Sequence, residues 1–215
     1  MSSAAALSMS AQIRSRKQPR AQLTKDKILD SAVALYLSDG IDDTTVSEII
    51  KQSGVGRTTF YRYFKDQDEV LNQAVIRDFE KLIADFDAQR FEHDDPAVQI
   101  VEDICWFNRQ LRSRPALRLL FSDRTERLYQ KLDLSVDTFE RLGKSSAQPT
   151  YDLARKKGML RKGINLKKYV EWSTFTLVAL QTASFPFTQN EFSLRDMLRD
   201  FLVPALINVN APEQQ

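Results

Sequence analysis

The stretch TVSEIIKQSGVGRTTFYRYFK, residues 45–65, decides the fold of the N-terminal part of this chain. Thr45 and Glu48 have the spacing of a capping box at the start of a short helix. Gly54 then turns the chain into a second short helix, and two such helices joined by a glycine-containing turn are typical of a helix-turn-helix motif. Before the motif, residues 24–40 repeat apolar side chains at helical spacing and predict a third helix that completes a small core.

The second helix of the motif, residues 56–65, contains no acidic residue. Phe60 and Phe64 lie one turn apart and can pack on the other two helices. The side chains that remain outside are Arg57, Thr58, Tyr61, Arg62 and the hydroxyl of Tyr63. Arginine can donate two hydrogen bonds to guanine and threonine can place its methyl on thymine, while tyrosine hydroxyls reach phosphate oxygens. We therefore predict a helix that reads DNA, the alternative being a positive face that is only solvated.

Residues 55–65 resemble the recognition segment of the TetR family of bacterial transcriptional regulators, including its Phe-Tyr-x-Tyr-Phe-Lys ending. The resemblance covers residues 24–75, and beyond them only the expected architecture is similar. It implies that operator DNA is bound by side chains facing either bases or phosphates. The implied base-facing residues are Arg57, Thr58 and Arg62. The implied phosphate-facing residues are Thr45, Tyr61, Tyr63 and Lys65, with Thr59 near the boundary between the two groups.

Two features of the chain modify this expectation. Many members of the family have lysine where this chain has Gln67, so the resemblance implies that one phosphate contact is reduced to a backbone amide. We also expect residues 1–23 to be a disordered tail that could enter the minor groove beside the operator site. The tail contains no acidic residue, and its basic residues are Arg14, Arg16, Lys17 and Arg20.

The rest of the chain also predicts helices. Apolar periodicity and helix-breaking residues indicate helical segments at 67–91, 96–112, 116–122, 123–144, 150–158, 166–185 and 191–209, with a loop at 145–149. The chain therefore reads as all-α, with about nine helices and no strands. A three-helix helix-turn-helix domain over residues 24–66 is followed by a helical effector-binding and dimerisation domain over residues 67–215.

The last two long helices favour a homodimer. The helix at 166–185 is apolar nearly all round, so it must be covered on two sides, and the helix at 191–209 has a comparable face. A two-fold dimer would also place two reading helices about one DNA turn apart on a palindromic operator. The expected interface residues are Phe175, Val178, Phe192, Met197, Leu198 and Phe201. The alternative is two core helices of a monomer.

An effector pocket is expected among the helices at 67–91, 96–112, 116–144 and 166–185. Trp106 is unusual because it follows Gln99 and Asp103 on a side of the helix that we expect to face solvent, so its ring should contact another group. The expected lining residues are Trp106, Phe107, Phe121, Phe139 and Trp172. Aromatic lining suits an apolar or aromatic effector, and for each residue the alternative is simple core packing.

Composition excludes several other classes of function. The net charge is only +2, so charge alone does not indicate nucleic acid, and the single Cys105 favours a reducing cytoplasm. One histidine, His93, gives little support to a metal site or to catalysis, so we expect no metal, no cofactor and no enzyme activity. We predict a cytoplasmic, nucleoid-associated repressor that a small effector releases from DNA. The alternative is a DNA-bound protein whose C-terminal domain docks a protein partner.

Overall fold

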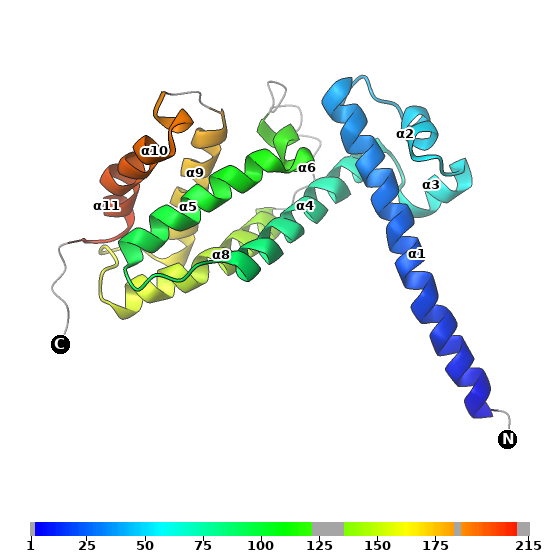
Figure 1. Ribbon diagram of the computed structural model, residues 1–215, viewed down its shortest axis with the longest axis horizontal. Helices are drawn as coiled ribbons and strands as arrows, with labels where there is room; N and C mark the ends of the chain where they lie inside the picture. The colour runs from blue at the N-terminus through cyan, green and yellow to red at the C-terminus, as the bar shows by residue number, and fades with distance from the viewer. Residues whose placement is uncertain (1–2, 122–135, 183–185, 210–215) are drawn as a thin grey trace. The chain divides into compact units, whose positions relative to one another are not determined.

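The computed structural model describes the backbone of residues 3–121, 136–182 and 186–209; within these ranges, the side chains at 3–19, 136–142, 187 and 189 are not described. The chain divides into two compact units, Met1–Val75 and Ile76–Gln215. Helices dominate both units (Figure 1). Within the described ranges there is no strand, only an isolated antiparallel bridge between Leu160 and Ile207. The all-α prediction is thereby confirmed.

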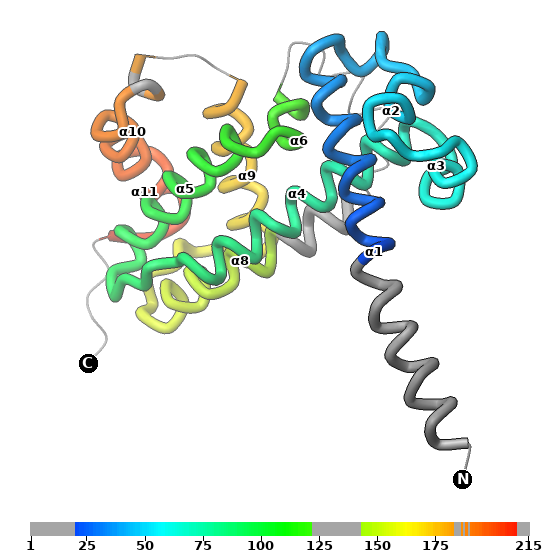
Figure 2. Tube along the Cα trace, turned by 45° about the vertical axis from the view of Figure 1, so that its right-hand side comes forward, coloured from blue at the N-terminus to red at the C-terminus, as the bar shows by residue number. Residues whose placement is uncertain are grey.

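The first unit contains α1 (Ser3–Ser38), α2 (Val46–Ser53), α3 (Arg57–Tyr63) and the start of α4 (Gln67–Gln89). α2 packs against α1, and α3 follows α2 after a tight turn (Figure 2). All four helices contribute buried apolar side chains, several from α1 and α4 and a single one each from α2 and α3. The buried apolar side chains of this core are Ile28, Leu29, Ala32, Val33, Tyr36, Ile49, Phe60, Phe64, Val70, Leu71, Ala74 and Val75.

The first helix is longer than the sequence suggested. A disordered tail was expected over residues 1–23, whereas α1 begins at Ser3. Thr24, the expected N-cap, lies inside α1, where its hydroxyl donates a hydrogen bond to the carbonyl of Arg20 at 2.9 Å. The tail contains five Ala, three Gln and three Arg residues, which favour helix, although its five Ser residues and Pro19 do not. A helix that has already nucleated extends without the cost of a new nucleus.

The boundary between the units lies inside α4, after Val75, rather than after residue 66. The first turns of α4 bury Val70, Leu71, Ala74 and Val75 in the first unit. Lys25 of α1 also donates a hydrogen bond to the side chain of Gln73, at 3.0 Å. These contacts assign the start of α4 to the helix-turn-helix core, although no break in the helix marks the division.

The second unit is a bundle around α5 (Pro96–Ser113), which packs against most of the other elements of the unit. The further elements are α6 (Pro115–Arg118), η1 (Leu119–Phe121), α8 (Val136–Lys156), α9 (Leu166–Thr182), η2 (Pro186–Gln189), α10 (Glu191–Met197), the π-helical turn η3 (Leu198–Leu202) and α11 (Val203–Leu206). α10, η3 and α11 follow one another without a break and together form the last expected helix. One apolar cluster joins α5, α8, α9 and this last helix.

The expected loop at 145–149 is wrong, because α8 continues through it. Pro149 lies inside the helix and lacks the amide that would continue the hydrogen-bond ladder. The following turn nevertheless buries Thr150 and Ala154 completely. Burial of this face outweighs a proline cost of about 3 kcal/mol. The expected helix at 123–144 lies largely outside the described residues, and its last part belongs to α8.

Candidate DNA-binding surface

The start of α2 is closed by the predicted capping box. The hydroxyl of Thr45 accepts a hydrogen bond from the amide of Glu48 at 3.3 Å. In return, the amide of Thr45 donates to the carboxylate of Glu48 at 2.7 Å. The side-chain hydrogen bond from Thr45 is the main cause that lowers the pKa of Glu48 below its usual value. The box fixes where α2 begins, whereas a phosphate contact of Thr45 stays a prediction.

The turn between α2 and α3 depends on one glycine conformation. Gly54 has a φ of 62°, in the left-handed region that side chains other than glycine rarely adopt. Its amide donates to the carbonyl of Lys51 at 3.3 Å, which ends α2. A Cβ at this position would lie 3.6 Å from the amine of Lys27, so the backbone angle and not space demands glycine. The turn places α3 directly after α2.

The inner side of α3 is anchored by aromatic packing, as the sequence predicted. Phe60 and Phe64 are 0% and 1% exposed, and their ring centroids lie 5.9 Å apart. Ile49 of α2 is fully buried in the same core. An edge-to-face contact of 5.4 Å links Phe60 to the more exposed ring of Tyr61. The outer side of α3 therefore stands on a packed platform.

The outer side of α3 carries the expected DNA-facing residues. Arg57, Thr58, Tyr61 and Arg62 are all exposed. The guanidinium of Arg57 lies 5.3 Å from the ring centroid of Tyr61, and the guanidinium of Arg62 lies 5.0 Å from that of Tyr63. Stacking of this kind restricts both arginine side chains while it leaves their donors accessible. The structure therefore brings the base-facing candidates together on one face.

The remaining phosphate-facing candidates border this face. Tyr63 and Thr59 are half-buried, and Tyr63 accepts a long hydrogen bond from Arg62, at 3.5 Å. Lys65 follows α3, has an 87% exposed side chain and lies 3.8 Å from Asp66. Such an exposed ion pair holds the lysine weakly. Lys65 can therefore exchange its carboxylate partner for a phosphate.

The start of α4 carries features that the sequence analysis missed. The amide of Glu69 donates to the carboxylate of Asp66 at 2.9 Å, and the amide of Lys65 donates to that of Glu69 at 2.6 Å. The Asp-x-x-Glu spacing at 66–69 resembles the box at 45–48 and was available as a signal. The side chain of Gln67 points back into the unit, where it donates to the carbonyl of Ile41. No sequence pattern announces that contact.

Several expected effector-pocket residues form an aromatic cluster in the second unit. Phe86 of α4 lies 5.1 Å from Trp106 and 4.6 Å from Phe107 between ring centroids, and it is 2% exposed. Trp106 thus contacts the buried ring of Phe86. This contact explains why an aromatic residue lies on the side of α5 that was expected to face solvent. Phe121 is half-buried in η1, and the side chain of Phe139 lies outside the described residues.

Trp172 does not join this cluster. Its side chain is 46% exposed and stacks on Phe175 of the same helix at 5.2 Å. Trp172 thus lies on the exposed side of α9 with a candidate interface residue, rather than in an enclosed pocket.

The expected interface residues separate into three groups by exposure. Phe175, Phe192 and Phe201 are 60%, 73% and 67% exposed, so α9 and the last helix each show large apolar side chains to solvent. Val178 and Met197 are half-buried. Leu198 is only 3% exposed and belongs to the core of the unit. An interface role for Leu198 does not fit the structure, because its helix turns this side chain inward while Phe201 points out.

A buried polar network was missed altogether. Asp103 of α5 lies between Arg90 at the end of α4, at 3.5 Å, and the hydroxyl of Thr150, which donates to it from α8. Gln99 also donates to Asp103, at 2.6 Å. Burial raises the pKa of Asp103, and the hydrogen bond from Thr150 is the largest of the effects that oppose it. The network could not be predicted from sequence, because Arg90 and Thr150 are distant from Asp103 along the chain.

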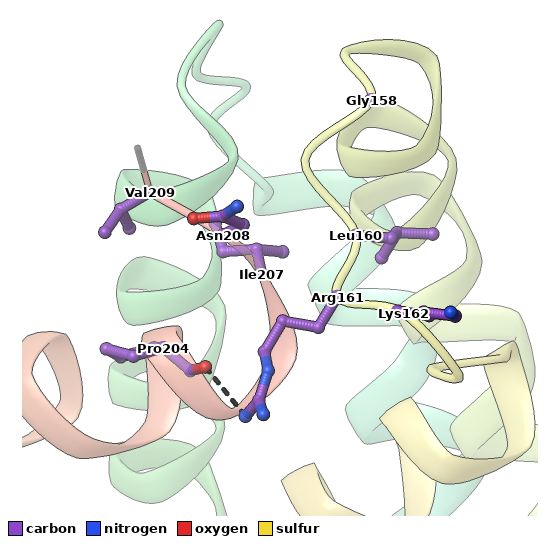
Figure 3. Close-up of a pocket in the computed structure, with 8 residues that line it drawn as sticks. All are labelled: Gly158, Leu160, Arg161, Lys162, Pro204, Ile207, Asn208 and Val209. Carbon is purple, nitrogen blue, oxygen red and sulfur yellow. Dashed lines mark hydrogen bonds between the residues drawn. The ribbon is translucent and has the colours of Figure 1, made fainter. Parts of the chain in front are cut away.

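A surface hollow of about 410 Å³ lies where the connector after α8 meets the end of the last helix (Figure 3). Arg161 crosses it and donates to the carbonyl of Pro204 at 3.1 Å. The lining residues are Gly158, Leu160, Arg161, Lys162, Pro204, Ile207, Asn208 and Val209. None of the expected effector-pocket residues lies here, so this hollow is distinct from the expected pocket.

Other chemistry finds little support in the described part of the chain. There, no group of three or more His, Cys, Asp or Glu side chains is arranged to hold a metal ion. No helix among the described residues is both long and apolar enough to cross a membrane. Cys105 is buried, and burial raises the pKa of its thiol to about 11, so it is a poor nucleophile at neutral pH.

Comparison with known proteins agrees with this geometry. The model of the family described as bacterial regulatory proteins, tetR family, matches residues 28–74, which hold α2, α3 and the helix portions packed around them. Over these residues the chain is similar to the TetR family. An uncharacterized HTH-type transcriptional regulator of Mycobacterium tuberculosis is 29% identical over 103 residues, 48% of this chain and 51% of that protein. The biofilm operon negative regulator IcaR of Staphylococcus epidermidis is 32% identical over 71 residues, 33% of this chain and 37% of IcaR.

The chain spans about half the length, or less, of the curated relatives that it matches. Solved structures extend the likeness of the fold. A TetR-family regulator of Haemophilus influenzae superimposes with a TM-score of 0.65 at 17% identity, covering 87% of this chain and 98% of that one. FadR of Bacillus subtilis, described in complex with stearoyl-CoA, gives 0.61 at 18% identity, with coverages of 80% and 96%. These relatives are named as regulators and not as enzymes.

Proposed function

We propose that the protein is a sequence-specific DNA-binding transcriptional repressor that acts as a homodimer on a palindromic operator, in the cytoplasm at the nucleoid. The observation that carries this proposal is the outer face of α3. Arg57, Thr58, Tyr61 and Arg62 are exposed there without an acidic neighbour on the helix, above the buried Phe60 platform. The relative IcaR is named a negative regulator, which supports repression over activation.

The homodimer is supported by the exposed aromatic side chains of α9 and the last helix. An interface would remove three exposed side chains from solvent, those of Phe175, Phe192 and Phe201. Burial of one such side chain contributes about 1.5–3 kcal/mol to the free energy of association. A monomer exposes large apolar patches rarely. Two copies would also double the number of base pairs read, because α3 alone is only seven residues long.

A small apolar or aromatic effector would release the operator. The cluster of Phe86, Trp106 and Phe107 would supply an apolar, aromatic lining for such a molecule. The stearoyl-CoA of the Bacillus subtilis neighbour carries a long apolar chain, although that ligand belongs to a different protein. Effector binding would favour a dimer in which the two α3 helices are wrongly spaced for DNA.

The experiment that tests DNA binding starts from random duplexes. Sites selected with the purified protein should be palindromic, and Arg62→Ala should weaken binding to them without unfolding the protein. Recovery of no common sequence would contradict the proposal.

The effector is tested by thermal-shift screening against apolar small molecules. Stabilisation by a compound that also releases the selected DNA supports the effector. If no compound stabilises the protein, the second function is favoured, in which the second unit docks a protein partner instead of a small ligand.

A further inference from the structure

Two helix starts in the first unit, those of α2 and α4, are each rigid by themselves. Thr45 and Glu48 close the start of α2 with reciprocal hydrogen bonds. Asp66 and Glu69 close the start of α4 in a related way. Helix N-termini direct backbone amides and a positive dipole outward, so both starts are suited to face phosphates. The two caps are local, however, and neither determines the distance between the starts.

Gln67, the first residue of α4, joins the two starts. Its side-chain amide donates a hydrogen bond to the backbone carbonyl of Ile41, 2.5 Å away. Its own backbone carbonyl accepts a hydrogen bond from the hydroxyl of Tyr36, at 3.3 Å. Tyr36 lies near the end of α1 and is 2% exposed. One residue of α4 is thereby bonded both to the last turns of α1 and to the loop that follows them.

That loop leads directly into α2. Gly40 opens it with a φ of 98°, and the hydroxyl of Thr44 donates to the carbonyl of Gly40 at 2.7 Å. Thr44 is 2% exposed, and the next residue is Thr45, the cap of α2. Because the loop is closed by Thr44, a bond that holds Ile41 also holds Thr45. The bond from Gln67 therefore sets where α2 begins relative to α4.

We propose that Gln67 is a positioning residue for DNA binding, whose side chain fixes the spacing of the α2 and α4 starts instead of contacting a phosphate. The proposal rests on the proposed DNA-binding function. It replaces the sequence-based expectation that Gln67 merely lacks a contact: the side chain has a structural partner inside the unit. A glutamine suits this role, since the half-buried carbonyl of Ile41 needs a hydrogen-bond donor. A neutral amide also brings no charge into the joint, which is formed by the contacts of Gln67 with Ile41 and Tyr36.

The test compares Gln67→Met, which keeps the length of the side chain and removes its donors, with Gln89→Met as the matched control. Gln89 lies on the same helix and is exposed. In the DNA-free protein, Gln67→Met should speed amide hydrogen exchange over residues 41–48. Its affinity for the selected operator should fall about 3- to 10-fold, the size expected for the loss of one buried hydrogen bond. Gln89→Met should change neither quantity.

Tyr36→Phe supplies a second arm, because it removes the other bond of the joint without a change in volume. Both substitutions act on one joint, so the affinity loss of the double variant should be smaller than the product of the two single losses. Unchanged exchange at residues 41–48 in Gln67→Met would overturn the proposal, and so would faster exchange with full DNA affinity. Failure of the wild-type protein to bind any selected duplex would instead overturn the DNA-binding function, and the exchange data would still report on the joint.

Discussion

Removal of Lys65 should weaken binding to any DNA, whereas removal of Arg57 should weaken binding to the operator alone, although both are exposed cations at α3. Lys65 is assigned to a phosphate and Arg57 to a base edge. The side chain of Lys65 is 87% exposed and lies 3.8 Å from Asp66, and such surface pairs contribute about 0–1 kcal/mol to stability. Lys65→Ala should therefore remain folded. The change in DNA affinity caused by this substitution then reports the loss of one phosphate contact per protomer.

The magnitude follows from counterion release. Each lost phosphate contact reduces the slope of log affinity against log salt by about 0.9, which gives about 1.8 for a dimer. Between 50 and 200 mM salt, the ratio of wild-type to Lys65→Ala affinity should thus shrink by a factor of about 12. The ratio should be the same on the operator and on a scrambled duplex. Arg57→Ala should instead lose about 5- to 150-fold per half-site on the operator and little on the scrambled duplex.

Fluorescence anisotropy of labelled duplexes at several potassium chloride concentrations measures both quantities, with circular dichroism to verify folding. The assignment of the two residues is refuted if Lys65→Ala discriminates between operator and scrambled DNA. It is refuted equally if Arg57→Ala weakens binding to both duplexes by the same factor. Equal salt slopes for wild type and Lys65→Ala would show that the lysine does not contact a phosphate.

Three further changes test the scaffold. Gly54→Ala should destabilise the protein by about 1–2 kcal/mol in urea unfolding, because the turn keeps its left-handed φ; an unchanged midpoint would show that the turn relaxes. Glu48 has a lowered pKa, so its contribution to stability is present above the usual carboxyl value of 4.5 and is lost as pH falls through the lowered folded value. The midpoint temperature of thermal unfolding should therefore be lower for Glu48→Gln than for the wild type at neutral pH, and the two midpoints should converge in acid. A difference in midpoint that stays constant with pH would contradict this. Phe201→Glu should give monomers in sedimentation, whereas Phe91→Glu, which also changes an exposed phenylalanine, should leave the dimer intact.

The fold was predictable where local signals agreed with each other. The spacing of Thr45 and Glu48, the glycine at 54 and the apolar pair of Phe60 and Phe64 all describe the same two helices, and the structure contains each feature. Prediction failed at Pro149, because a proline that usually interrupts a helix lies beside a face whose burial compensates for it. Burial of that face depends on distant helices, so no local pattern could reveal it.

The residues of the candidate site also divide into those that local sequence patterns identify and those that depend on distant partners. Exposed residues of α3 could be identified from sequence, since helical periodicity alone separates Arg57 and Arg62 from the buried Phe60. Gln67 and Asp103 could not, because their partners are a loop carbonyl and side chains of other helices. A residue type reports what a side chain can donate or accept, whereas only the fold decides which group receives it. For Gln67 this difference changes the interpretation from an absent phosphate contact to a bond that places the start of α2, so substitutions at this position test the loop of the free protein as well as its affinity for DNA.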